Sequence, residues 1–476
     1  MNRELRQQID IWTEADEHQK VIDALENIAP EKRDFEEIGL LARAYNYIDE
    51  YDTALTLLQS IQEEGKDDTN WNFRMGYALY YLDRSREALA HFRKADELTP
   101  DDEDTIDFIR CCNKEMPFRA RVDAFWQWFL QNEAELSKLV EKRDEYDSDQ
   151  VLGLIDQGLG LISEDIYFNM GGDYEFTFSI EGNEYLFYLY PYLISRMPEQ
   201  LKGKWHFSPY NQGADAPFSF QMYGAQIDMQ DVYVHAHYDE QHNDFAVSFY
   251  EEHLCSLPEA QAYNAFYIMM ELMLGEGLSY QYIANVKRVE KLEEEMFPLP
   301  ELRSYITETL KANGKQVFEN PKDVFISYRL EPKENEELRY DVAIGTTRFS
   351  HLISQYYEGD TGLFDKLNQF GAQAVFLAFP YDNIGADERK AVLDFRYKLE
   401  DRIEKEILNQ DGLGLLLGGA TGTGSCYIDL LLYDVNAFLD KVVPVLREYS
   451  EYSFYLSDFR QHCMITRLSA SAESDD

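Results

Sequence analysis

The chain has 476 residues, which is enough for about three domains. With 45% hydrophobic residues it can form a core, so its 28% charged residues do not make it a disordered chain. Its 89 acidic residues exceed its 44 basic residues and give a formal net charge of −45, which argues against nucleic acids and anionic membranes as direct partners. This charge would attract a basic partner, although keeping the protein soluble is the simpler explanation.

The cysteines and the first residues indicate the compartment. The five cysteines are odd in number and form no Cys-x-x-Cys pair, and the first residues lack the apolar core of a signal peptide. No run of about 18 apolar residues could span a bilayer. We therefore expect a cytoplasmic protein with reduced thiols, which ends in an acidic, solvated tail at residues 471–476.

Residues 1–117 contain three segments that repeat at a nearly fixed period. The clearest copy contains Met75, Gly76, Leu79, Ala88, Phe92, Ala95 and Pro100. The copy before it contains Leu41, Ala42, Tyr45, Ala54, Leu58 and Ile61, and a looser first copy contains Val21, Leu25, Ile28 and Pro30. The pattern resembles the tetratricopeptide repeat, in which small residues lie where two helices cross. Residues 101–116 predict a polar helix that caps the array.

This resemblance implies a superhelix whose concave groove binds peptides or proteins. The candidate groove residues lie on the first helix of each pair and are Arg43, Asn46, Asn72 and Tyr80. No cluster of basic residues for a terminal carboxylate is evident, so we do not expect a receptor for C-terminal peptides. A purely structural platform is the alternative to a binding groove.

Residues 118–290 predict a second domain, of the α+β class. Helical spacing of apolar residues predicts helices at residues 125–140, 148–162, 191–197 and 258–274. Alternation with a period of two predicts strands at residues 165–170, 174–180, 184–190, 232–238, 245–250 and 278–289. The first three of these strands are expected to form an antiparallel meander.

Histidines at the end of one predicted strand are candidate metal ligands. His235 and His237 share a face of strand 232–238, and Asp239 and His242 lie in the turn that follows. Nothing in the sequence fixes a third ligand, and such pairs are also common on the outer face of a sheet. We expect no cofactor.

Residues 291–320 predict a connector, helical over 291–309 and interrupted by Pro298 and Pro300. The third domain, residues 321–470, begins with a hairpin and two helices. Its later elements are predicted at residues 373–379, 386–409, 413–418, 426–433, 434–449 and 452–459. Their order is βαββαβ, the ferredoxin-like arrangement.

A glycine-rich segment joins the two middle strands of that domain. Gly419 and Gly424 have the five-residue step of a phosphate-binding loop, but Ser425 and Cys426 follow in place of Lys and Ser or Thr. We therefore predict a flexible hairpin turn and no phosphate site.

The strand after this turn places Tyr427, Leu431 and Tyr433 on one face. That face is too apolar to be bare, so either another layer of the chain or a protein partner is expected to cover it. RNA-recognition domains share the βαββαβ topology, but Lys and Arg are nearly absent from these strands.

Residues 379–434 carry a second resemblance. They contain a strand ending in Pro380, an acidic helix with Leu393 and Glu400, the glycine-rich turn and a Tyr-Ile-Asp strand ending at Asp434. They resemble an uncharacterised bacterial domain family that is related in fold to the regulator-of-RNase-E-activity inhibitor domain. Members of the inhibitor family bind an enzyme and restrain it, which implies a regulatory role here.

The sequence therefore predicts an α+β multidomain protein, with an N-terminal α-solenoid followed by two α+β domains. We expect a bacterial protein-binding scaffold or regulator, including an inhibitor or immunity-type protein that acts on a basic partner such as a nuclease. The alternative is an enzyme or small-molecule sensor with a pocket between the two α+β domains. Against an enzyme, the sequence has no Gly-x-Ser-x-Gly, His-Glu-x-x-His or Ser-x-x-Lys motif.

Overall fold

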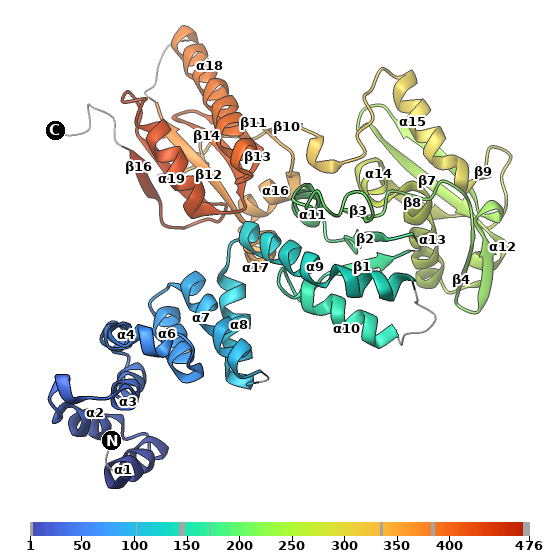
Figure 1. The fold of residues 1–476 in the computed structure, drawn as a ribbon. Coiled ribbons are helices and arrows are strands. Elements are labelled where there is room, and N and C mark those ends of the chain that lie inside the picture. Colours follow the sequence, from blue (N-terminus) through green and yellow to red (C-terminus); the bar gives the residue numbers. More distant parts are fainter. Residues whose placement is uncertain are drawn as a thin grey trace. The chain divides into compact units, whose positions relative to one another are not determined.

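The protein is a mixed α+β chain that separates into two compact units (Figure 1). The computed structural model describes residues 3–100, 102–141, 148–171, 173–333, 337–381 and 386–469. Unit 1 is Met1–Arg121 and unit 2 is Val122–Asp476. None of the described helices is long and apolar enough to span a membrane.

Unit 1 is helical throughout its described residues. Its helices are α1 (Arg3–Glu14), α2 (His18–Glu26), α3 (Phe35–Asn46), α4 (Tyr51–Ser60), α5 (Gln62–Gly65), α6 (Thr69–Tyr81), α7 (Ser85–Leu98) and α8 (Glu103–Glu115). Neighbouring helices pack together along the chain, and α6 also contacts α3 and α8. A Cβ atom at Gly76 would lie 2.9 Å from the ring of Phe92, so a small residue is required where α6 crosses α7.

The first half of unit 2 contains three small sheets. Its helices are α9 (Phe118–Glu141), within which the two units divide, α10 (Ser148–Leu159), α11 (Leu186–Ser195), α12 (Glu252–Ser256), α13 (Glu259–Leu274), α14 (Glu276–Tyr282) and α15 (Leu302–Ala312). Its strands are β1 (Tyr167–Met170), β2 (Glu175–Ser179), β3 (His206–Ser208), β4 (Ser219–Met222), β5 (Ala225–Asp228), β6 (Tyr233–Asp239), β7 (Asp244–Tyr250), β8 (Ile283–Arg288) and β9 (Phe297–Pro298). The sheet orders are β1-β2-β3, β4-β5 and β8-β7-β6-β9.

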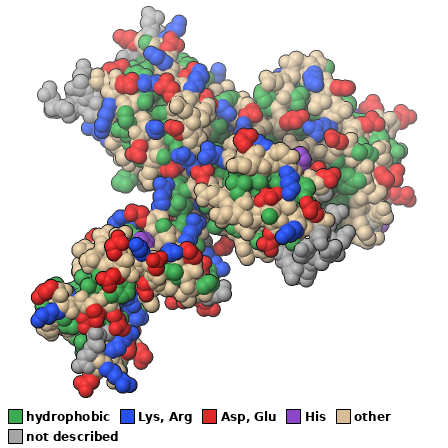
Figure 2. All heavy atoms as spheres, in the orientation of Figure 1, with side chains coloured by type: hydrophobic (Ala, Val, Ile, Leu, Met, Phe, Trp, Pro, Cys, Tyr) green, Lys and Arg blue, Asp and Glu red, His purple; other side chains and the backbone are tan. Residues whose placement is uncertain are grey.

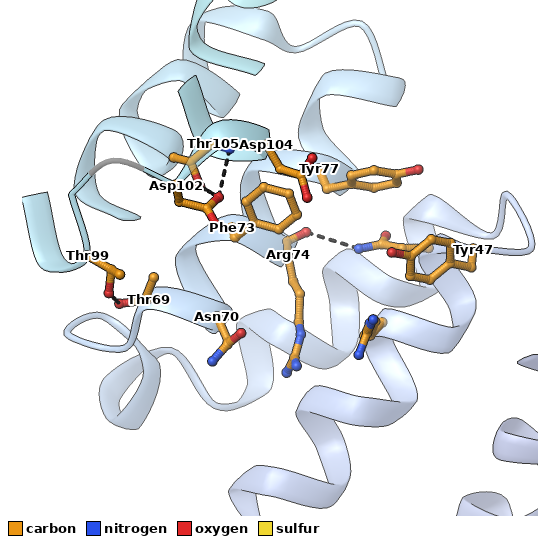
Figure 3. A pocket seen from close by; sticks show the side chains of 12 residues that line it. Tyr47, Thr69, Asn70, Phe73, Arg74, Tyr77, Thr99, Asp102, Asp104 and Thr105 are labelled. Carbon is orange, nitrogen blue, oxygen red and sulfur yellow. Dashed lines mark hydrogen bonds between the residues drawn. The ribbon is translucent and has the colours of Figure 1, made fainter. Parts of the chain in front are cut away.

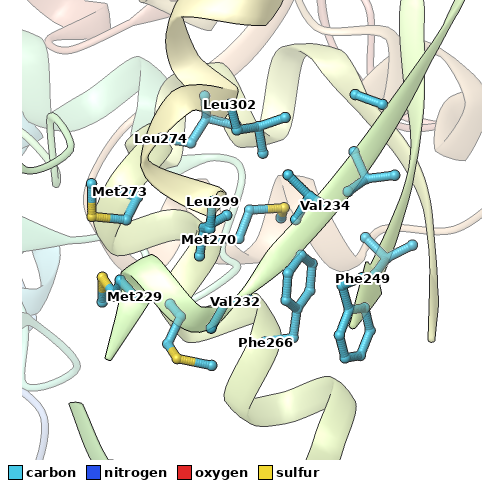
Figure 4. Packing of buried hydrophobic residues seen from close by; sticks show 14 of the residues in the cluster. Met229, Val232, Val234, Phe249, Phe266, Met270, Met273, Leu274, Leu299 and Leu302 are labelled. Carbon is cyan, nitrogen blue, oxygen red and sulfur yellow. The ribbon is translucent and has the colours of Figure 1, made fainter. Parts of the chain in front are cut away.

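A compact hydrophobic core lies between the four-stranded sheet and α13–α15 (Figure 4). The rings of Phe249 and Phe266 stack with their centroids 4.0 Å apart. Val234 from β6, Met270 from α13 and Leu302 from α15 are buried in the same cluster. Residues around 300–312 therefore belong to this core.

Three expectations for this region are wrong. Residues 184–190 form no strand and supply the first half of α11 from Leu186 onward, because their apolar run is buried and such a run does not distinguish a strand from a helix. The third strand of the first sheet is β3, which pairs parallel to β2. Residues 278–282 are helical before β8 begins, and the connector at 291–309 becomes helical only from a 3-10 turn (Leu299–Glu301) that leads into α15.

The second half of unit 2 is built on a seven-stranded sheet. The strands are β10 (Ile326–Arg329), β11 (Val342–Thr347), β12 (Gln373–Pro380), β13 (Gly414–Gly422), β14 (Ser425–Leu432), β15 (Phe454–Asp458) and β16 (Thr466–Ser469). The helices are α16 (Ser350–Glu358), α17 (Gly362–Gln369), α18 (Ala386–Ile403), which continues as a π-helical segment (Glu404–Asn409), and α19 (Val435–Leu446). The order is β10-β11-β13-β14-β12-β15-β16, and every neighbouring pair is antiparallel.

The glycine-rich segment is mostly strand. β13 continues to Gly422 and pairs with both β11 and β14, so the turn is shorter than expected. The carboxylate of Asp341 accepts hydrogen bonds from the amides of Gly424 and Ser425, both at 2.9 Å. An acid from the same chain therefore occupies the position that a bound anion would take at a glycine-rich turn.

The second face of β14 is covered by the chain itself. Tyr427, Leu431 and Tyr433 are 1%, 0% and 4% exposed, which removes them as a contact surface for a partner. The hydroxyl of Tyr433 donates to the carbonyl of Tyr188 on α11 at 2.7 Å. The sequence left open whether another layer of the chain or a protein partner covers this face, and the structure shows that the chain covers it.

A buried ion pair lies at the centre of that face. Arg339 and Asp429 have no exposed side-chain surface and form two hydrogen bonds, of which Nη2 to Oδ2 measures 3.2 Å. The Arg339 guanidinium also lies 4.5 Å from the ring centroid of Phe459 and 5.1 Å from that of Phe376. The nearby carboxylate of Asp429 opposes the effect of burial and holds the pKa of Arg339 above its ordinary value.

We predict that Asp429→Ala will strongly destabilise unit 2. The substitution leaves Arg339 buried without a counter-charge, which costs about 3–5 kcal/mol. Chemical denaturation followed by near-UV circular dichroism measures the loss. The double variant Arg339→Met/Asp429→Leu should recover most of the stability, and Asp401→Asn at an exposed pair with Lys405 should have little effect. An Asp429→Ala protein as stable as wild type contradicts the prediction.

Candidate functional site

A pocket of about 270 Å³ lies in unit 1 between α3, α6 and the start of α8 (Figure 3). Two of the four predicted groove residues, Arg43 and Asn46 on α3, line it. Its other lining residues come from α3, α6 and the chain around the start of α8, and they are Tyr47, Thr69, Asn70, Phe73, Arg74, Tyr77, Thr99, Asp102, Asp104 and Thr105. On α3 and α6 the lining residues are related by steps of three or four, so those of each helix lie on one side of it.

The other two predicted groove residues lie elsewhere. The side chain of Asn72 is buried, where its amide donates to the carbonyls of Asp68 and Lys66 at 2.9 and 3.1 Å. Tyr80 packs against Phe108 of α8 with ring centroids 5.5 Å apart. Neither lines the pocket, because both point from α6 toward other helices of unit 1.

Aromatic rings continue from the pocket along the same surface. Tyr47 lies 6.1 Å from Tyr77 between centroids, and Tyr77 lies 4.8 Å from Tyr81. Tyr81 stacks on Tyr51 at 5.0 Å, and Tyr47 stacks on His18 at 4.5 Å. Tyr47 and Tyr81 are 49% and 45% exposed, so this aromatic strip presents ring surface to solvent.

No described carboxylate forms an ion pair with the two arginines of the pocket, Arg43 and Arg74, although the charge of Asp68 opposes the effect of burial on the pKa of Arg74. Burial, and secondarily the charge of Arg43, lower the pKa of Arg74 to about 10. The guanidinium of Arg74 packs against the backbone of α3, where a Cβ at Gly39 would lie 2.6 Å from Nη1. Two like charges are thus held close together in a partly desolvated position.

Asn46 adds an unsatisfied acceptor to the same pocket. It is 3% exposed, and its amide nitrogen donates to the carbonyl of Arg74 at 3.1 Å. Its Oδ1 atom is buried and has no hydrogen-bond partner among the described residues. An unsatisfied buried acceptor costs free energy, so a donor from a ligand would be favourable there.

The candidate metal ligands His235, His237, Asp239 and His242 are not gathered into one cluster. His235 Nε2 lies 3.5 Å from Glu295 Oε2, whereas His242 Nδ1 contacts Asp239 Oδ2 at 2.8 Å. His237 is exposed on β6. Across the part of the chain that the structure describes, no group of three or more His, Cys, Asp or Glu side chains is placed to hold a metal ion.

A buried carboxyl lies on the helical side of the seven-stranded sheet. Glu400 of α18 approaches β13 at Gly419, where a Cβ atom would lie 2.2 Å from Glu400 Oε1. Arg396 Nε is 3.2 Å from Glu400 Oε1, and Arg396 Nη1 donates to Thr421 Oγ1 at 3.0 Å. Burial raises the pKa of Glu400 to about 7, although Arg396 opposes the shift.

Sequence reasoning missed half of the arginine pair and most of the rings of the pocket. The sequence does contain a pattern that points to this surface: Phe73, Arg74 and Tyr77 are spaced so that they share one face of α6. A step of four from Arg43 on α3 reaches Tyr47, and a step of three from Tyr80 reaches Tyr77. No such step from a predicted groove residue reaches Arg74.

We predict that Arg74→Met will stabilise unit 1. The variant keeps the apolar stem and removes a desolvated charge that faces Arg43, so the free energy of unfolding should rise by about 1 kcal/mol. Slower hydrogen exchange in α3 and α6 of the full chain measures the gain. Arg84→Met is the matched control, because Arg84 forms an exposed ion pair with Glu87 and should gain nothing. Faster exchange in the Arg74 variant contradicts the prediction.

We also predict that Glu400 makes the stability of unit 2 depend on pH. Because the pKa is raised by folding, its favourable contribution is complete below about pH 4.5 and is lost as the pH rises through about 7. Relative to wild type, Glu400→Gln should therefore be more stabilising at pH 8 than at pH 5, by on the order of 2–3 kcal/mol. Denaturation at both pH values measures this difference. Asp401→Asn is the exposed control, and an equal effect of Glu400→Gln at both pH values refutes the assignment.

Comparison with known proteins does not extend this description. No protein-family model matches the sequence, and no curated protein matches it significantly. The inference of function therefore rests on the geometry of the pocket and its surroundings.

Proposed function

We propose that the protein is a cytoplasmic protein-binding scaffold or regulator, in which the pocket of unit 1 receives an extended segment of a partner. The observation that carries this proposal is the pocket with its aromatic strip. Exposed rings beside a few placed polar groups are typical of recognition surfaces, since rings bury much area at a small entropic cost. The described polar groups of the pocket include the unpaired Arg43 and Arg74.

The packing of unit 1 supports a tetratricopeptide-like α-solenoid. The helices pair in sequence, and α6 contacts α3 and α8, as expected when equivalent helices of successive pairs lie side by side. The close approach of Gly76 and Phe92 fits the small position of that repeat. In such an array the inner helices form a concave surface, and the pocket residues lie on those helices.

The core of the seven-stranded sheet supports a ferredoxin-like arrangement. Strands β13-β14-β12-β15 are adjacent and antiparallel, and residues of α18 and α19 share one hydrophobic cluster with them. We infer that this domain contributes the regulatory part of the scaffold. Its second sheet face is already covered by the chain, so a partner would contact its helices or edges.

The charge of the chain supports a basic partner at long range. The chain has a net charge of −45, and acidic and basic side chains are interspersed over the face drawn in Figure 2. A field of this sign speeds the approach of a positively charged protein and repels polyanions. Contact then depends on the local groups of the pocket.

We predict that Tyr47→Ala will weaken capture of the partner by the full chain. The exposed ring of Tyr47 links the pocket to the aromatic strip, and loss of such a ring typically costs 1–2 kcal/mol or more in binding. Quantitative affinity capture from the native cell extract compares wild type with this variant. Tyr305→Ala in α15 is the control, since Tyr305 is 38% exposed but lies in unit 2. A partner captured equally by both variants refutes a role for the pocket.

A further inference from the structure

The pocket of unit 1 has a local charge opposite to that of the chain. In a protein of net charge −45, cations readily find acidic neighbours, and Arg84 and Arg6 each pair with a nearby glutamate. Arg43 and Arg74 form no such pair among the described residues. Keeping two unpaired arginines together lowers stability unless a ligand supplies the missing charge.

The charges of the pocket are also separated in space. Asp102 and Asp104 stand at the start of α8, while Arg43 and Arg74 extend from α3 and α6. Figure 3 shows Arg74 extending away from Asp104 on the far side of Phe73. An anionic group is therefore attracted to the arginine end and repelled from the α8 end, which gives a bound segment a direction.

The unsatisfied acceptor of Asn46 complements this arrangement. Its Oδ1 lies in the wall between the two arginines' helices and needs a donor. A peptide backbone supplies N–H donors beside its side chains, whereas a simple inorganic anion supplies none. The combination of cations and a buried acceptor fits a peptide segment with an acidic side chain.

We propose that the pocket binds the side-chain carboxylate of an Asp or Glu residue within an extended segment of the partner. The carboxylate lies between Arg43 and Arg74, and a backbone N–H near it donates to Asn46 Oδ1. This inference rests on the proposed function and names the chemistry that the site recognises. Such charge-assisted bonds are stronger than neutral ones, so they select an acid over its amide.

The segment passes through the pocket and does not end in it. On one side the aromatic strip continues beyond the pocket to Tyr51 and Tyr81. On the other side the pocket is itself lined by Thr69 and Thr99, whose hydroxyls are 2.8 Å apart. Contact surface on both sides favours a side chain of an internal residue over a free chain terminus.

Selection from displayed random peptides tests the proposal with the full-length protein. One library holds the peptides inside a display protein, so that no free carboxyl terminus is present, and a second library ends in a free terminus. We expect wild type to enrich internal peptides with an Asp or Glu at one fixed position. Arg43→Gln/Arg74→Met should lose that preference, whereas Arg84→Met, which lies outside the pocket, should keep it.

An affinity measurement completes the test. For an enriched peptide with acetylated and amidated ends, replacement of its acid by the corresponding amide should weaken binding at least tenfold in fluorescence anisotropy. The same replacement should change little with Arg43→Gln/Arg74→Met. Hydrogen exchange of α3 and α6 shows whether that double variant is folded.

The outcomes separate this inference from the proposed function. Enriched peptides without an acidic preference overturn the carboxylate assignment and leave peptide binding standing. An acidic preference found only in the library with free termini overturns the assignment to an internal side chain. Failure of both libraries to yield any peptide that depends on the pocket overturns the proposed function together with the inference.

Discussion

The buried contact between Arg339 and Asp429 is the constraint on which the larger unit depends. A carboxylate at the centre of a sheet is costly unless a cation neutralises it, and Arg339 does so from the loop between β10 and β11. Arg339 adopts a positive φ of 74°, a strained conformation that persists only when surrounding contacts enforce it. The hydroxyl of Tyr357 and the ring of Phe459 are among those contacts. Asp341 likewise fills the glycine-rich turn, where its carboxylate accepts from two backbone amides. The chain therefore supplies the counter-charge at both places itself.

Two buried arginines of unit 2 are paired within the chain, unlike the arginines of the pocket of unit 1. In the sheet, Arg339 meets Asp429 and Arg396 meets Glu400, so each of these buried cations has an acid from the same chain. In unit 1, Arg43 and Arg74 form no ion pair with a described acid, although the charge of Asp68 acts on Arg74, and they lie beside an unsatisfied acceptor. Binding sites often keep groups that lower the stability of the free protein, because the same groups are needed to contact the ligand. This contrast supports our proposal that unit 1 carries the recognition site.

The sequence predicted what depends on short spacing and missed what depends on long-range pairing. The repeat placed Leu41, Met75 and Gly76 correctly in the core, because helical periodicity is local. Asn72 was misplaced because it lies two positions from Arg74, which turns it to a different side of α6. The partnership of Arg339 with Asp429 joins residues 90 positions apart and leaves no local pattern. The first half of α11 was predicted as a strand, because a run that is apolar on all sides has no period, whereas its second half lies within the helix predicted at residues 191–197.

The net negative charge of the chain and the local positive charge of the pocket act at different distances. Together they restrict the kind of partner that the proposed site can bind. The net charge of −45 acts across solvent, where salt screens it within about 8–10 Å. The field of Arg43 and Arg74 acts at contact, where water is partly excluded and screening is weak. A partner drawn by the first and held by the second has a basic surface but presents an acidic residue in an extended segment. A uniformly acidic protein is repelled before contact, and a uniformly basic one has no carboxylate to offer the two arginines.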